Sequence, residues 1–178
     1  AEHRAGELEA VLSTLSDLIR LPDAPAEVRA WALAIRGNAY GQQGETELAI
    51  ADYATVIDMS DATAEHRAWA LINRGNAYGE QGKDKLVIAD CTAVIDMPDA
   101  PAEQRAMALF NRGVTYGQQG KVELEIADYT TVINMPDAPA ELRAKALANR
   151  AVTCDQQGRA KLAIADYTTV IDMPDAPA

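Results

Sequence analysis

Two series of oppositely charged side chains return every 38 residues in this sequence, which is a pattern that allows regularly placed ion pairs. The series are Arg36, Arg74, Arg112 and Arg150, and Asp52, Asp90, Asp128 and Asp166. Because both series have the same period, we predict an Arg–Asp pair within each repeat or between neighbouring repeats. We interpret these pairs as structural, since such pairs fix geometry when buried and contribute little when exposed.

No residue pattern in the sequence resembles an active site. It contains no phosphate-binding glycine loop, no Cys/His cluster and no nucleophile elbow. His3 and His66 do not recur with the repeat, and His66 is expected at a tolerant surface position. Cys91 and Cys154 stand where the other repeats have tyrosine, so we predict that both are buried, reduced thiols. We therefore expect no catalytic residue, no metal site and no cofactor.

The elements that carry these residues are predicted to be paired helices. In the first full repeat, Asp23-Ala24-Pro25-Ala26-Glu27 predicts a helix start with an acidic cap and a proline in the first turn. This first helix is expected to end near Gln42, before a glycine that can adopt the left-handed conformation. A second helix is expected from about Glu45 to Asp58, because its apolar residues share one helical face. The turn glycines are Gly44, Gly82, Gly120 and Gly158.

Repetition of this helix pair predicts one array over residues 1–178 with about nine helices. The array consists of a half repeat at 6–23 and full repeats at 24–61, 62–99, 100–137 and 138–175. It opens with the second helix of a pair and closes on a motif that elsewhere starts a helix. We therefore expect the array to be part of a longer chain.

A glycine recurs in the middle of the first helix, at Gly37, Gly75 and Gly113, and Ala151 replaces it in the fourth repeat. A glycine inside a helix costs roughly 1 kcal/mol relative to alanine. Its return predicts a contact at this position that is too close for a side chain.

The segments Ala-Leu-x-x-Arg-Gly-Asn-Ala-Tyr and Leu-Ala-Ile-Ala-Asp-Tyr, joined by a glycine turn, resemble the tetratricopeptide repeat over residues 6–173. The resemblance implies an all-α fold in which antiparallel helix pairs stack into a right-handed superhelical solenoid. It also implies a protein–protein interaction scaffold that binds a peptide or protein segment in its concave groove. The period of 38 exceeds the family's usual 34, and we expect the extra residues before the first helix to add one helical turn.

Glu125 departs from the family pattern, because it occupies a tight apolar position where the first and fourth repeats have Ala49 and Ala163. A lone carboxylate buried there would cost several kcal/mol. We therefore expect Glu125 to find a cation or to reach water.

By the same resemblance, the first helices line the groove with carboxamides and large apolar side chains. Carboxamides can bond the backbone of an extended peptide, and aromatic side chains supply contact area at low entropic cost. Packing of the aromatic and methionine residues between repeats is the alternative. The candidate ligand-binding residues are Trp31, Asn38, Trp69, Asn73, Asn76, Met107, Phe110, Asn111, Lys145 and Asn149.

The acidic net charge of the chain limits the classes of partner that it can bind. The formal net charge is −11, which disfavours nucleic acid and anionic membranes because neutralising phosphates requires clustered lysine and arginine. No apolar run approaches membrane-spanning length. We expect a cytoplasmic protein whose partner is another protein or peptide.

Two other functions remain open at this stage. Near-identical units with apolar terminal faces could self-associate end to end as a structural or spacer array. Alternatively, the array could recruit substrate for a larger enzyme or signalling protein. Catalysis by this segment itself is not expected.

Overall fold

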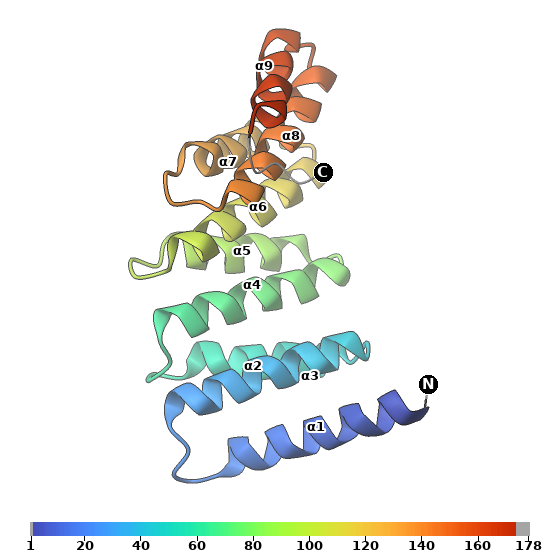
Figure 1. Cartoon of the computed structure of the whole chain (residues 1–178), viewed down its shortest axis with the longest axis vertical. Helices are drawn as coiled ribbons and strands as arrows, with labels where there is room; N and C mark the ends of the chain where they lie inside the picture. The colour runs from blue at the N-terminus through green and yellow to red at the C-terminus, as the bar shows by residue number, and fades with distance from the viewer. Residues whose placement is uncertain (1, 174–178) are drawn as a thin grey trace. The chain divides into compact units, whose positions relative to one another are not determined.

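Nine helices and no strands make up residues 2–173, the part of the chain that this computed structural model describes, with side chains described from Leu8 onward (Figure 1). The predicted all-α fold and the number of helices are therefore confirmed for this range. The side chain of His3 and the expected helix-start motif at 174–178 lie outside the described part. The helices are α1 (Glu2–Arg20), α2 (Ala26–Gln42), α3 (Thr46–Asp58), α4 (Ala64–Glu80), α5 (Asp84–Ile95), α6 (Ala102–Gln118), α7 (Val122–Asn134), α8 (Ala140–Gln156) and α9 (Ala160–Ile171).

The helices divide into two compact units, and each is described by itself. The first unit runs to residue 93 and includes 97–99, and the second comprises 94–96 and the helices from α6 onward. Within each unit, consecutive helices run antiparallel and pack on one another, and the first helices of neighbouring repeats also touch, α2 with α4 and α6 with α8 (Figure 1). Antiparallel helix pairs are thus stacked within each unit. A single array over residues 1–178 and its superhelical hand stay predictions.

Each unit has a core in which small residues of the first helices meet larger residues of the second helices. The burial of Cys91 and Cys154 in free form is confirmed for both thiols. Burial also raises the pKa of the Cys154 thiol. The core of the first unit includes Ala30, Leu33, Ala49, Tyr53, Val56, Ala62 and Ala70, and that of the second includes Ala106, Leu109, Tyr129, Val132, Ala138, Leu142 and Ala146.

The turn within each helix pair uses the predicted glycine. Gly44, Gly82, Gly120 and Gly158 have φ angles of 78°, 66°, 69° and 71°, a region that side chains disfavour. In the first repeat, the amide of Glu45 donates to the carbonyl of Tyr40 at 2.9 Å across this turn. The left-handed glycine therefore reverses the chain while the last carbonyls of the first helix keep partners.

The predicted acidic helix cap is wrong. Pro25, Pro101 and Pro139 occupy the N-cap positions of α2, α6 and α8 without a side-chain cap. Asp23 instead belongs to a turn in which the amide of Ala24 donates to the carbonyl of Leu21 at 3.2 Å, two residues too early to cap. Only in α4, among the helices so described, does a side chain act as cap, since Thr63 accepts from the amide of His66 at 3.2 Å.

Two predicted helix boundaries also differ from the structure. The segment before the first helix is only partly helical, because Pro25 is extended (ψ 144°) and the helix begins at Ala26. The expected extra turn is therefore formed by its second half alone. The first helix, α1, begins at Glu2, before residue 6, where the predicted half repeat starts.

Candidate functional site

One stripe along the first unit combines aromatic and polar side chains. It consists of the residues of α2 and α4 that face the same side of these two neighbouring helices, and we call it the α2–α4 face. At its start, a pocket of about 240 Å³ is lined by Trp31, Ala34, Ile35, Glu65, His66 and Trp69. Trp31 is 54% exposed, whereas the ring of Trp69 packs edge-on against Tyr53 at 6.0 Å. Trp31 is therefore the aromatic ring that a ligand can cover.

The same stripe continues into a polar hollow of about 350 Å³, the α2–α4 hollow. It is lined by Asn38, Gly41, Gln42, Thr46, Ala49, Tyr53, Asn73, Asn76, Ala77 and Glu80. The hydroxyl of Tyr53 donates to Oδ1 of Asn38 at 2.7 Å. Burial raises the pKa of Tyr53 to about 12, so this hydroxyl keeps its proton at neutral pH and remains a donor.

A second hollow occupies the equivalent place two repeats later, and we call it the α6–α8 hollow. It has a volume of about 310 Å³ and is lined by Val114, Gly117, Gln118, Glu125, Tyr129, Asn149, Val152, Thr153 and Gln156. Val114 and Val152 replace the asparagines Asn38 and Asn76 of the first hollow. The two hollows therefore share a position in the repeat but differ in chemistry.

Glu125 lies in the α6–α8 hollow and finds no cation among the described residues. Its side chain accepts a hydrogen bond from Thr153 at 2.8 Å, and the residue is 8% exposed. A Cβ placed on Gly117 would lie 2.8 Å from the carboxyl carbon of Glu125, so the glycine provides its space. Of the two expectations for Glu125, a cation partner is absent among the described side chains, and contact with water through the hollow that it lines stays a prediction.

The predicted ligand-binding residues fall into several environments. In the first unit, Trp31, Asn38, Trp69, Asn73 and Asn76 all line the α2–α4 face. Two of the carboxamides also bond within the fold, because Asn38 accepts from Tyr53 and Asn73 donates to the carbonyl of Trp69 at 2.8 Å. Only part of their hydrogen-bonding capacity is therefore available to a ligand.

In the second unit the predicted residues are less uniform. The ring of Phe110 packs against Tyr129 at 5.7 Å as part of the core, whereas Met107 is exposed. Lys145 pairs with Glu141 of its own helix at 2.6 Å, and Asn149 donates to the hydroxyl of Tyr129 at 3.3 Å. The sequence predicted that these residues and Asn111 line the groove, but of these five only Asn149 lines the α6–α8 hollow.

Sequence reasoning missed the floor of both hollows, which the second helices contribute. Thr46, Ala49 and Tyr53 of α3 line the first hollow. Glu125 and Tyr129 of α7 line the second. The unusual residue type at Glu125 was an available signal, because the other repeats have small or apolar residues there.

The Arg–Asp pairs are present in every repeat, and each joins the two helices of its own pair. The guanidinium of Arg36 contacts Asp52 at 2.6 Å, and the later pairs are separated by 2.7, 2.8 and 2.7 Å. Each arginine donates through both Nε and a terminal nitrogen, which is the bidentate geometry of strong charge-assisted bonds. The aspartates are buried.

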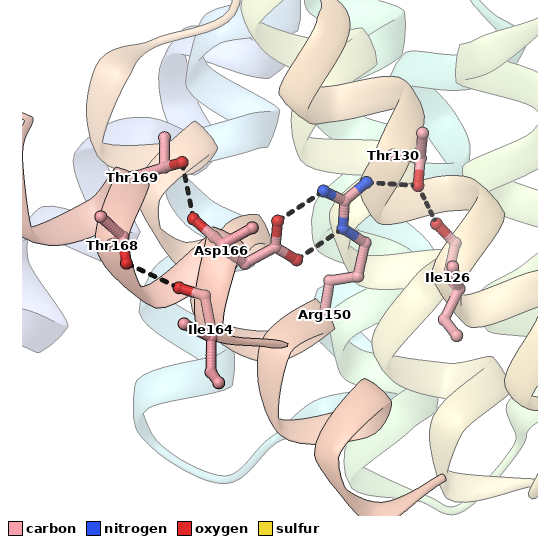
Figure 2. A network of polar contacts seen from close by, with 8 residues as sticks. Ile126, Thr130, Arg150, Ile164, Asp166, Thr168 and Thr169 are labelled. Carbon is pink, nitrogen blue, oxygen red and sulfur yellow. Dashed lines mark hydrogen bonds and ion pairs between the residues drawn. The ribbon is translucent and has the colours of Figure 1, made fainter. Parts of the chain in front are cut away.

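Arg36 and Arg150 also reach the preceding second helix. Figure 2 shows Arg150 between Asp166 and the hydroxyl of Thr130, to which it donates at 2.7 Å. The hydroxyl of Thr130 in turn donates a hydrogen bond to the carbonyl of Ile126 at 2.6 Å. Arg36 makes the same kind of bond to Ser16 at 2.9 Å. These arginines therefore tie three successive helices together, which supports the structural interpretation of both series.

Among the side chains described from Leu8 to Met173, no group of three or more His, Cys, Asp and Glu residues is placed to hold a metal ion. None of the helices described there is long and apolar enough to cross a membrane.

The comparison with known proteins agrees with the helix pairs and turns described above. Residues 32–63 match the family model described as tetratricopeptide repeat. The chain therefore contains a tetratricopeptide-type repeat at this segment. Among solved structures, it is similar to MamA, residue 41 to the end, from Desulfovibrio magneticus RS-1, with a TM-score of 0.70 and 20% sequence identity. The similarity covers 95% of this chain and 86% of that one, and at this identity it concerns the fold alone. A search of the curated proteins finds no match.

Proposed function

We propose that this tetratricopeptide-type protein is a non-catalytic interaction scaffold that binds an extended polypeptide along the α2–α4 face. The observation that carries the proposal is the continuous stripe from the tryptophan pocket to the polar hollow. From Trp31 to Gln42 the stripe follows α2 for roughly 16 Å, which is about the length of five extended residues. A ligand of that length would place an apolar side chain at one end and polar groups at the other.

The chemistry of the stripe suits a peptide better than a small charged metabolite. Its apolar part is an exposed indole, a residue type that often dominates binding energy. The polar part offers carboxamides and hydroxyls rather than clustered charge. Such groups match the alternating donors and acceptors of a peptide backbone.

A library of random 12-residue peptides, selected on the full chain, tests this proposal. We expect the selected peptides to share an apolar or aromatic residue and to bind Trp31→Ala at least about tenfold more weakly. The comparison variant is Leu48→Ala, which removes an exposed apolar side chain from α3 that lines none of the pockets described above. It should bind like the unmodified chain. Affinity is measured by fluorescence polarisation. If Trp31→Ala binds the selected peptides as tightly as the unmodified chain does, the α2–α4 face is not the binding site.

A second candidate function, self-association, is favoured by the outer face of α9. Ile164 and Ile171 are 65% and 80% exposed, and Tyr167 lies between them on the same face. In the preceding repeat the equivalent Tyr129 is only 1% exposed, and α8 packs on that helix. The face of α9 therefore has the composition of a surface that a helix covers.

Self-association through α9 predicts a concentration-dependent molar mass. Light scattering after size exclusion should show dimers or larger species that Ile164→Glu with Ile171→Glu removes, because two charges cannot be buried in an apolar contact. The fold should survive, since both side chains are exposed, and circular dichroism checks this. A constant monomer mass at all concentrations excludes this function for the chain.

A further inference from the structure

The α6–α8 hollow contains a charge that the fold does not neutralise. Glu125 is more than nine-tenths buried, and the structure gives it no lysine, arginine or histidine partner among the side chains described from Leu8 to Met173. The other side chains that line the hollow are uncharged, namely Val114, Gln118, Tyr129, Asn149, Val152, Thr153 and Gln156. The hollow is therefore negative at its floor.

Neutral partners alone satisfy this carboxylate. The Tyr129 hydroxyl bonds to it, and Thr153 donates to Oε1 of Glu125 at 2.8 Å but also lies 3.1 Å from the carbonyl of Asn149. Because a hydroxyl has a single proton, it can serve only one of these acceptors at a time. A buried carboxylate gains most from a cation, and here the cation would have to come from outside.

Comparison with the α2–α4 hollow shows that several positions differ together. Ala49 and Ala77 of the first hollow become Glu125 and Thr153, which are in contact with each other. Val114 and Val152 occupy the positions that Asn38 and Asn76 have in the first hollow. The α6–α8 hollow therefore combines aliphatic side chains with a carboxylate, whereas the α2–α4 hollow has carboxamides at these positions. Aliphatic walls above a carboxylate match a side chain that has a methylene stem and a cationic head.

We propose that the α6–α8 hollow receives a lysine or arginine side chain of a bound polypeptide, with the Glu125 carboxylate as its counter-ion. Val114 and Val152 contact the methylene groups, and Thr153 orients the carboxylate. The inference rests on the proposed function only in taking a polypeptide as the source of the cation. The hollow itself lies in the second unit and is separate from Trp31.

The test uses a blocked amino acid as the probe, so that it needs no known partner. Nα-acetyl-lysine methylamide is titrated into the ¹⁵N-labelled full chain, and the amide signals of Gly117 and Thr153 are followed by NMR. We expect saturable shifts with this probe, and binding at least about tenfold weaker with the norleucine analogue, which keeps the stem and lacks the charge.

Three variants make the result specific to Glu125. Glu125→Ala should abolish the shifts while keeping the fold, because alanine occupies the equivalent position at Ala49 and Ala163. Glu125→Gln, close in size, provides the same test if the alanine variant is unstable. Ala49→Glu combined with Ala77→Thr should create lysine binding in the α2–α4 hollow, where a Cβ on the equivalent Gly41 has nothing within 4 Å.

Equal binding of the norleucine analogue, or unchanged lysine binding by Glu125→Ala and Glu125→Gln, overturns the inference. Tighter binding of n-pentylamine than of the blocked lysine would overturn the polypeptide as the source. The proposed function is tested independently, because Trp31 does not line the α6–α8 hollow. It is contradicted if Trp31→Ala leaves peptide binding intact, whatever the result of the lysine titration.

Discussion

An Asp52→Ala variant is expected to lose about 3 kcal/mol of unfolding free energy, because it leaves the guanidinium of Arg36 without its carboxylate. Asp52 is 5% exposed and accepts both the Nε and a terminal nitrogen of Arg36, at 2.8 and 2.6 Å. Arg36 also donates to Ser16 of α1, so its displacement weakens the contact between α1 and α2 as well. Urea unfolding followed by circular dichroism measures the loss.

The matched control is a surface acid on the same helix. Glu47 pairs with Lys83 at 3.9 Å, and both side chains are largely exposed. Exposed pairs contribute about 0–1 kcal/mol, so Glu47→Ala should leave stability nearly unchanged. If both variants lose the same amount, burial of the Arg–Asp pair does not stabilise the fold.

A paired substitution separates the cost of an orphaned charge from the value of the pair. Arg36→Met with Asp52→Leu removes both charges and keeps similar volume. Replacing a buried ion pair in this way is often neutral or stabilising. We therefore expect the double variant to be more stable than Asp52→Ala, although it retains neither member of the pair.

The sequence predicted those features that the repeat itself determines. Equal spacing of the arginines and aspartates predicted the pairs, but it left open whether a pair joins helices of one repeat or of two. The structure places every aspartate in the arginine's own repeat, while the hydroxyls of Ser16 and Thr130 add the contact to the preceding helix. Spacing alone could not show this, because the series Ser16, Ala54, Thr92 and Thr130 is interrupted by an alanine, which has no hydroxyl.

The chemistry of the hollows was less predictable, because it depends on contacts between side chains that lie on different helices and far apart in the sequence. The residue type at Glu125 indicated an unusual site, yet its partner Thr153 lies 28 residues away in the next repeat. The change from Ala77 to Thr153 at one repeat position was visible in the sequence and could have signalled the pair. The engagement of Asn38 by Tyr53 depends on side-chain conformations, which the repeat pattern does not encode.

Alanine in the middle of the first helix is expected to have opposite effects in the first and second repeats. A Cβ on Gly37 would lie 2.6 Å from the ring of Tyr53, and one on Gly113 would lie 2.9 Å from the ring of Tyr129. The predicted close contact is therefore real at these two positions, and it is made by a tyrosine. Overpacking of this kind costs typically 1–3 kcal/mol, so Gly37→Ala should destabilise the fold by about that amount.

Gly75 differs because its repeat has Cys91 in place of the tyrosine. A Cβ there would have Asp90 Cβ as its nearest neighbour at 3.7 Å, an ordinary van der Waals contact. Alanine is favoured over glycine inside a helix by roughly 1 kcal/mol, so Gly75→Ala should stabilise the protein by up to that amount. Thermal and urea unfolding of the two variants should therefore shift in opposite directions.

A double-mutant cycle identifies the tyrosine as the cause. In a Tyr53→Cys background, which copies the second repeat, the ring is gone and Gly37→Ala should change from destabilising to neutral or stabilising. Coupling between residues in direct contact typically reaches about 0.5–3 kcal/mol, well above the error of such measurements. If Gly75→Ala destabilises as much as Gly37→Ala, or if Tyr53→Cys leaves the effect of Gly37→Ala unchanged, then the backbone rather than the ring excludes the methyl group. The glycine would then be required by how closely the helices approach, and replacing the tyrosine could not relieve that requirement.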